Sequence, residues 1–150
     1  MPVPGTSARR PSLQVKFHPW YGLFTLAYLV GIYWLSSLSD FGVGEGEPMV
    51  QLASNLFHIP LYAGLAFCVL QALSGAQGIQ GVPCALSGLS FLGTAAYAAL
   101  DEWHQAFVPG RFASVGDFLL DLVGIVGMLF ILPRLGVDAM RLRQQSRARH

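Results

Sequence analysis

The sequence predicts an all-α protein, a bundle of four transmembrane helices with both termini in the cytoplasm. Of its 150 residues, 53% are hydrophobic and only 11% are charged, less than half of the roughly 25% charged residues of a soluble domain. The charges are also confined, because the stretch from Pro48 to Leu100 contains no Asp, Glu, Lys or Arg. A helix needs about 20 residues to cross the hydrocarbon core, so this stretch is long enough for two spans and a turn.

Four apolar segments are expected to form the spans. They are residues 20–38, 49–73, 82–100 and 115–135. Gly and Pro residues separate the first from the second at 42–48, and the second from the third at 75–83. Apolar runs of this length predict helices, because the strands of a membrane barrel are about 10 residues long and alternate in polarity. We therefore expect a cytoplasmic tail at 1–16, a membrane domain at 17–135 and a basic cytoplasmic tail at 136–150.

The basic residues predict the orientation of these spans. Lys and Arg number nine, and all except Arg111 lie before the first apolar segment or after the last one. Cytoplasmic loops carry the excess of Lys and Arg, so both termini are expected in the cytoplasm and the acidic loops outside. This is the pattern of a multi-pass protein of the cell membrane.

The sequence gives no support to several classes of function. The formal net charge of +1 gives no electrostatic footprint for nucleic acid, so we expect no nucleic-acid partner. The chain has no phosphate-binding G-x-x-x-x-G-K loop and no G-x-S-x-G, H-E-x-x-H or C-x-x-C motif. Two cysteines exclude a disulfide scaffold.

Polar residues inside the second apolar segment are the first sign of a site. Gln51, Asn55, His58 and Tyr62 are spaced by four, three and four residues, which places them on one stripe of a helix. A polar residue inside a bilayer is costly and indicates function by default. The alternative is a stripe of hydrogen bonds that only joins the helices.

The third and fourth segments carry stripes that point to the same end of the bundle. Ser90, Thr94 and Ala98 recur every four residues and lead to Glu102, while Asp101 and Gln105 share a face at the end of the third helix, with His104 and Gln105 expected just beyond it. Asp117, Asp121 and Gly124 share a face of the fourth helix. We predict that His58 meets these carboxylates in one outward-facing site.

Arg111 is the only internal basic residue and lies among several acids. We predict that it pairs with Glu102, Asp117 or Asp121, because an uncompensated charge in an interfacial, low-dielectric region is costly. It can also bind the phosphate of a lipid head group.

The run from Asp101 to Arg111, DEWHQAFVPGR, followed by Ser114, Asp117 and Gly124, resembles the VanZ-like family. Proteins that resemble this family have four spans and a D-E-x-x-Q-x-x-x-P-G-R-x-x-S-x-x-D signature before the last span. They also have an H-x-x-x-Y element in the second span, which His58 and Tyr62 match here. Asp121 departs from the family, which often has Asn there. The resemblance implies a role in the bacterial cell envelope, since the founding member is associated with resistance to the glycopeptide teicoplanin, but it implies no reaction.

Three functions remain open. The cluster can act on or bind an envelope lipid or anionic head group, it can bind a lipid or ion without catalysis, as a transporter-like protein does, or it can be a structural network. The candidate catalytic residues are His58, Asp101, Glu102, Asp117 and Asp121. The candidate binding residues are Asn55, Tyr62, His104, Gln105 and Arg111. A divalent cation is a candidate cofactor, and the candidate partners are membrane lipids and a lipid-linked envelope precursor.

Overall fold

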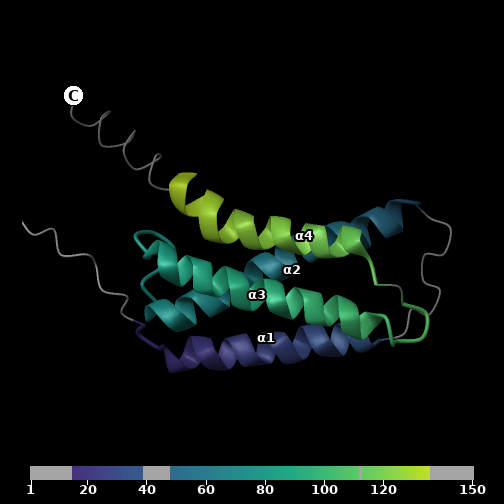
Figure 1. The fold of residues 1–150 in the computed structure, drawn as a ribbon, viewed down its shortest axis with the longest axis horizontal. Helices are drawn as coiled ribbons and strands as arrows, with labels where there is room; N and C mark the ends of the chain where they lie inside the picture. Colours follow the sequence, from purple (N-terminus) through teal and green to yellow (C-terminus); the bar gives the residue numbers. More distant parts are fainter. Residues whose placement is uncertain (1–14, 39–47, 112, 136–150) are drawn as a thin grey trace, which may run out of the picture.

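The computed structural model has four helices packed side by side (Figure 1). It describes residues 15–38, 48–111 and 113–135, and for 48–54 it describes the backbone only. The helices are α1 (Pro19–Ser37), α2 (Pro48–Ser74), α3 (Cys84–Gln105) and α4 (Val115–Val126), and α4 continues into a π-helical turn, η1 (Gly127–Ile131). The predicted all-α four-helix bundle is thereby confirmed.

Helix α2 is the centre of the bundle. It contacts all three other helices, whereas α1 and α4 share no contact within the described part of the chain. Figure 1 shows α1 and α4 on opposite sides of α3, with α2 passing behind. The ends of α1 and α3 and the starts of α2 and α4 therefore lie together at one end of the bundle, and the site is built there.

A glycine sets the distance between α2 and α4. A Cβ on Gly124 would overlap the backbone carbonyl oxygen of Ile59 and lie 3.2 Å from the backbone nitrogen of Ala63. Only glycine permits the two backbones to approach this closely. Since Gly124 is one turn beyond Asp121, the same contact brings Asp121 against α2.

The outer surface of the bundle is apolar. Large side chains such as Trp20, Phe24, Leu92 and Val123 are more than half exposed, which a soluble monomer rarely tolerates over a wide area. Three segments are long and apolar enough to cross a membrane, Asn55–Ser74, Cys84–Gln105 and Val115–Leu135. The chain is therefore a membrane protein.

Helix α1 departs from the predicted set of four spans, because it is not among these three segments. It has 19 residues and no charge, but its sequence contains two Trp and three Tyr, which lower its mean hydropathy. Both residue types are common where a helix meets the lipid head groups. Whether α1 crosses the membrane stays a prediction, and so does the orientation of the termini.

Helix α3 is longer than its apolar segment. It was expected to end near Leu100, but it continues to Gln105, so His104 and Gln105 lie within the helix and not beyond it. Hydropathy locates the apolar part of a helix, whereas the helix itself ends only where the chain turns. That turn comes at Pro109 and Gly110, where Gly110 has a φ of 81°.

Candidate functional site

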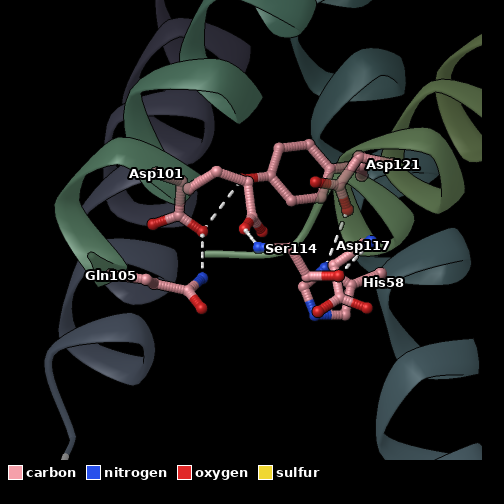
Figure 2. A network of polar contacts seen from close by, with 8 residues as sticks. His58, Asp101, Gln105, Ser114, Asp117 and Asp121 are labelled. Atoms are coloured by element: carbon pink, nitrogen blue, oxygen red, sulfur yellow. Dashed lines mark hydrogen bonds and ion pairs between the residues drawn. The ribbon is translucent and has the colours of Figure 1, made fainter. Parts of the chain in front are cut away.

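His58 and Asp121 form the link between α2 and α4. The Nδ1 atom of His58 lies 2.9 Å from Oδ1 of Asp121, and the Asp121 side chain is 1% exposed. When Asp121 is ionised its carboxylate only accepts, and the Nδ1–H of His58 then donates to it. The predicted meeting of the α2 stripe with the α4 face is confirmed (Figure 2).

Asp101 is held by two neighbours. The hydroxyl of Tyr62 and the side-chain amide of Gln105 each donate to its Oδ2 at 3.2 Å. Tyr62 is fully buried, and Asp101 and Gln105 are 6% and 4% exposed. The predicted common face of Asp101 and Gln105 is thus confirmed, and Tyr62 connects it to α2.

Glu102 joins α3 to the start of α4. Its Oε2 accepts a 2.8 Å hydrogen bond from the backbone nitrogen of Ser114. Ser114 is the N-cap of α4, and its Oγ accepts from the backbone nitrogen of Asp117. In a capping box one residue of the same helix accepts from the N-cap nitrogen; here the carboxylate comes from another helix, which fixes α4 against α3.

The small-residue stripe of α3 leads to this point. Ser90, Thr94 and Ala98 are at most 1% exposed, and Glu102 is 7% exposed. The stripe thus faces the bundle interior, as its spacing predicted.

Three acceptor atoms in this cluster are buried without a hydrogen-bond partner among the described residues: Oδ1 of Asp101, Oε1 of Glu102 and Oδ2 of Asp121. His58, Glu102 and Asp121 each offer one ligand atom, and these atoms lie within 4.8 Å of one another. Among the described residues, these three are therefore the set that can hold a metal ion.

A cavity of about 400 Å³ adjoins the cluster. Its polar wall includes His58, Asp101, Gln105 and Arg111. Its remaining lining is mostly apolar and comes from α1, its C-cap residue and α2: Leu35, Ser36, Leu38, Phe57 and Leu61. The volume lies within the range of small-molecule sites, so the polar cluster opens to a space that a ligand can enter.

Arg111 does not pair with the acids, and the prediction of an ion pair with Glu102, Asp117 or Asp121 is wrong. Its Nε donates to the carbonyl oxygen of Leu38 and its Nη2 to that of Leu35, each at 3.2 Å. The carbonyl of Leu35 also accepts from the backbone nitrogen of Leu38, the C-cap of α1, and carbonyls at the C-terminus of a helix carry partial negative charge. The turn at Pro109 and Gly110 directs Arg111 to these carbonyls at the end of α1.

Two other candidates lie apart from the cluster. His104 packs on α1, where its Nε2 lies 2.9 Å from Oγ of Ser37 and its ring is 4.6 Å from that of Tyr33. Asn55 is exposed and contributes no contact to the cluster. Gln51, on the same predicted stripe, lies outside the described side chains.

Sequence reasoning did not select Ser114 as a site residue, although it belongs to the motif. The spacing of Ser114 and Asp117 is that of an N-cap with its third helical residue, and this signal was available. The carbonyl groups of Leu35 and Leu38 carry no such signal, because every residue has one.

The fold and the site together define a class of membrane protein: a four-helix bundle with a buried acid and histidine cluster beside a cavity at one end. The model of the VanZ/LLP1 family matches residues 5–136. The chain belongs to this family, as the signature in the sequence had indicated. No curated protein and no solved structure gives a significant match.

Proposed function

We propose that this protein binds the head group of an anionic envelope lipid in the cavity between α1, α2 and α3. The single observation that carries the proposal is the two-sided lining of that cavity. Leu35, Phe57 and Leu61 offer apolar surface, while Arg111 offers N–H donors and His58 offers its second ring nitrogen. An amphiphile with a phosphate beside its acyl chain matches both halves.

Arg111 is the residue that would hold the phosphate. A guanidinium has five N–H donors, and the bonds to Leu35 and Leu38 use the hydrogens of Nε and one of those on Nη2. Fixing the side chain in this way orients the remaining donors at low entropic cost. Membrane phospholipids and lipid-linked envelope precursors both carry such a phosphate.

Lipid retention by a single arginine variant tests this proposal. Nanodiscs of phosphatidylcholine with a minor fraction of phosphatidylglycerol are prepared, and the lipid kept by the protein is counted by native mass spectrometry. Arg111→Gln should lower phosphatidylglycerol retention at least about tenfold, because a hydrogen bond to a charged group contributes about 1.5–3 kcal/mol and 1.4 kcal/mol is about tenfold in affinity.

Arg134→Gln is the matched control. Arg134 also donates to a helix carbonyl, that of Phe130 at 3.0 Å, but it lies at the far end of the α4 segment. Unchanged retention in Arg111→Gln, or an equal loss in both variants, would contradict a specific head-group site.

The His58 and Asp121 pair favours a second candidate function, acid–base catalysis on the same head group. A carboxylate that accepts from Nδ1 orients the imidazole and leaves its other nitrogen for proton transfer. Inorganic phosphate release from phosphatidic acid vesicles by the wild type, lost in His58→Gln and kept in His104→Gln, would support it. If the wild type releases no phosphate, catalysis is contradicted and head-group binding is the function that remains.

We also propose that the site faces the outer leaflet of the bacterial cytoplasmic membrane and affects teicoplanin susceptibility. The support is the placement of basic residues at the two ends of the chain and membership of the VanZ/LLP1 family. Bacteria that express Asp121→Asn should show the teicoplanin susceptibility of cells without the protein, at unchanged expression.

A further inference from the structure

Two buried carboxylate oxygens next to His58 lack a partner. Oε1 of Glu102 and Oδ2 of Asp121 accept no hydrogen bond from any described residue, although Glu102 is 7% exposed and Asp121 is fully buried. Buried polar atoms are nearly always hydrogen-bonded, and a buried carboxylate without compensation is strongly unfavourable. A bound proton or a further positive group can supply the missing compensation, and only the second can hold both carboxylates in their ionised form.

The described protein does not supply that group. His58 is the only basic side chain within 4 Å of a carboxylate in the part of the chain that the structure describes. The guanidinium of Arg111 donates to the carbonyls of Leu35 and Leu38. One imidazole thus serves a region that holds the carboxylates of Glu102 and Asp121, with Asp101 and Asp117 close by in the sequence.

The spacing of the donor atoms suits a single ion. One atom each from His58, Glu102 and Asp121 lie within 4.8 Å of one another. Ligands about 2.1 Å from a metal are at most about twice that distance apart, so small side-chain rotations close the set.

We propose that His58, Glu102 and Asp121 bind a divalent transition-metal ion, such as Zn²⁺ or Mn²⁺. Imidazole nitrogen favours Zn²⁺ and its neighbours, and carboxylate oxygen suits Mn²⁺. Three protein ligands leave at least one coordination position open. Since His58 also lines the cavity, that position is available to water or to an oxygen of a ligand there.

The metal site goes beyond the proposed head-group site, and neither requires the other. Full-length protein in detergent is stripped with a chelator and titrated with Mn²⁺, whose free form is counted by electron paramagnetic resonance. Zn²⁺ bound after gel filtration is measured by elemental mass spectrometry. The wild type should bind one ion per chain, with a higher thermal unfolding midpoint once loaded.

Each ligand variant is paired with a control variant that makes the same substitution at a nearby position. Glu102→Gln and Asp121→Asn should each weaken Mn²⁺ binding at least about tenfold, because each removes a ligand that contributes charge. Asp117→Asn, on the same helix as Asp121, removes an equal charge but no atom of the proposed ligand set, so it should weaken binding much less than Asp121→Asn does. His58→Gln should lose affinity, whereas His104→Gln should keep it.

Absence of saturable binding of either ion by the stripped wild type would overturn the metal site. Equal losses in Asp117→Asn and Asp121→Asn would also overturn it, since they indicate general electrostatic attraction. If Asp121→Asn does not fold, the titrations of Glu102→Gln and of the wild type still decide whether the metal site exists. Lipid retention measured with chelator present tests the head-group site separately.

Discussion

The two oxygens of Glu102 have different environments. Oε2 accepts from the backbone nitrogen of Ser114, and Oε1 has no partner among the described residues. The residue therefore combines a structural contact, which holds the start of α4, with an atom that is free to bind a ligand. Replacing Glu102 with glutamine, a neutral side chain of the same shape, separates the structural contact from the binding of a ligand.

Glu102→Ala should lower the free energy of unfolding by about 1–2 kcal/mol, as the loss of a capping interaction does. Glu102→Gln should stay within about 0.5 kcal/mol of the wild type, because its carbonyl oxygen still accepts from Ser114. Reversible unfolding in mixed micelles with increasing dodecyl sulfate measures both. Equal destabilisation by the two variants would show that the charge of Glu102, and not the cap, stabilises the fold.

The hydroxyl of Tyr62 is a buried donor that makes one hydrogen bond. It donates to Oδ2 of Asp101, and the Tyr62 side chain is fully buried. Tyr62→Phe should lower the free energy of unfolding by about 1–3 kcal/mol, because a buried carboxylate loses one of its donors. Tyr33→Phe, at an exposed position, should change it little. The same unfolding assay compares them, and equal effects would contradict the role given to Tyr62.

Residue spacing predicted much of the site, and the reason is geometric. His58 and Tyr62 lie four residues apart, as do Asp117 and Asp121, so each pair had to share a helix face. The partner of Arg111 could not be predicted, because it is a pair of backbone carbonyls selected by the path of the chain after Pro109.

At the scale of the elements, α2 and α4 form the contact on which the site depends. Gly124 lies against the backbone of Ile59 and Ala63, one turn from the bond between Asp121 and His58. The sequence placed Gly124 on the face of Asp121, but it gave no signal of how close α2 would come. The π-helical turn of η1 was not predicted either. Pro133 follows it, and proline disturbs the regular α-helical bonding of the preceding turn.

Gly124→Ala should lower the free energy of unfolding by about 1–3 kcal/mol, because the added methyl group forces α4 away from α2. It should also weaken Mn²⁺ binding by moving Asp121 from His58. Gly127→Ala is the control: its Cβ would meet nothing within 4 Å, so stability should be unchanged or slightly higher. Unfolding and metal titration of both variants test this, and a tolerated Gly124→Ala would contradict the close contact.

On the scale of the whole molecule, the bundle has two unlike ends. The segment before α1 pairs with the end of α2, where Lys16 and His18 donate backbone hydrogen bonds to Leu73 and Ala72. The acid cluster, the cavity and the motif loop lie at the other end. Since helix α2 rises about 1.5 Å per residue, His58 lies about 15 Å from the start of α2.

The orientation of this bundle decides which side of the membrane the site faces. We predict that both termini are cytoplasmic, because eight of the nine Lys and Arg residues lie at the two ends of the chain. Single cysteines are introduced as Gly5→Cys, Gly44→Cys or Ala148→Cys in a background where Cys68 and Cys84 are replaced by alanine. These three positions lie outside the described residues, so the labelling tests the sequence-based prediction directly.

An impermeant thiol reagent added to intact cells should label Gly44→Cys and leave Gly5→Cys and Ala148→Cys unlabelled until the membrane is permeabilised. That pattern requires α1 to cross the membrane despite its Trp and Tyr content, and it places the cluster end of the bundle outside. Labelling at position 5 with protection at 148 would mean that α1 does not span, since an odd number of crossings separates the termini. Labelling at both termini with protection at 44 would show that the bundle has the opposite orientation. The cavity beside His58 would then receive its ligand from the cytoplasmic leaflet.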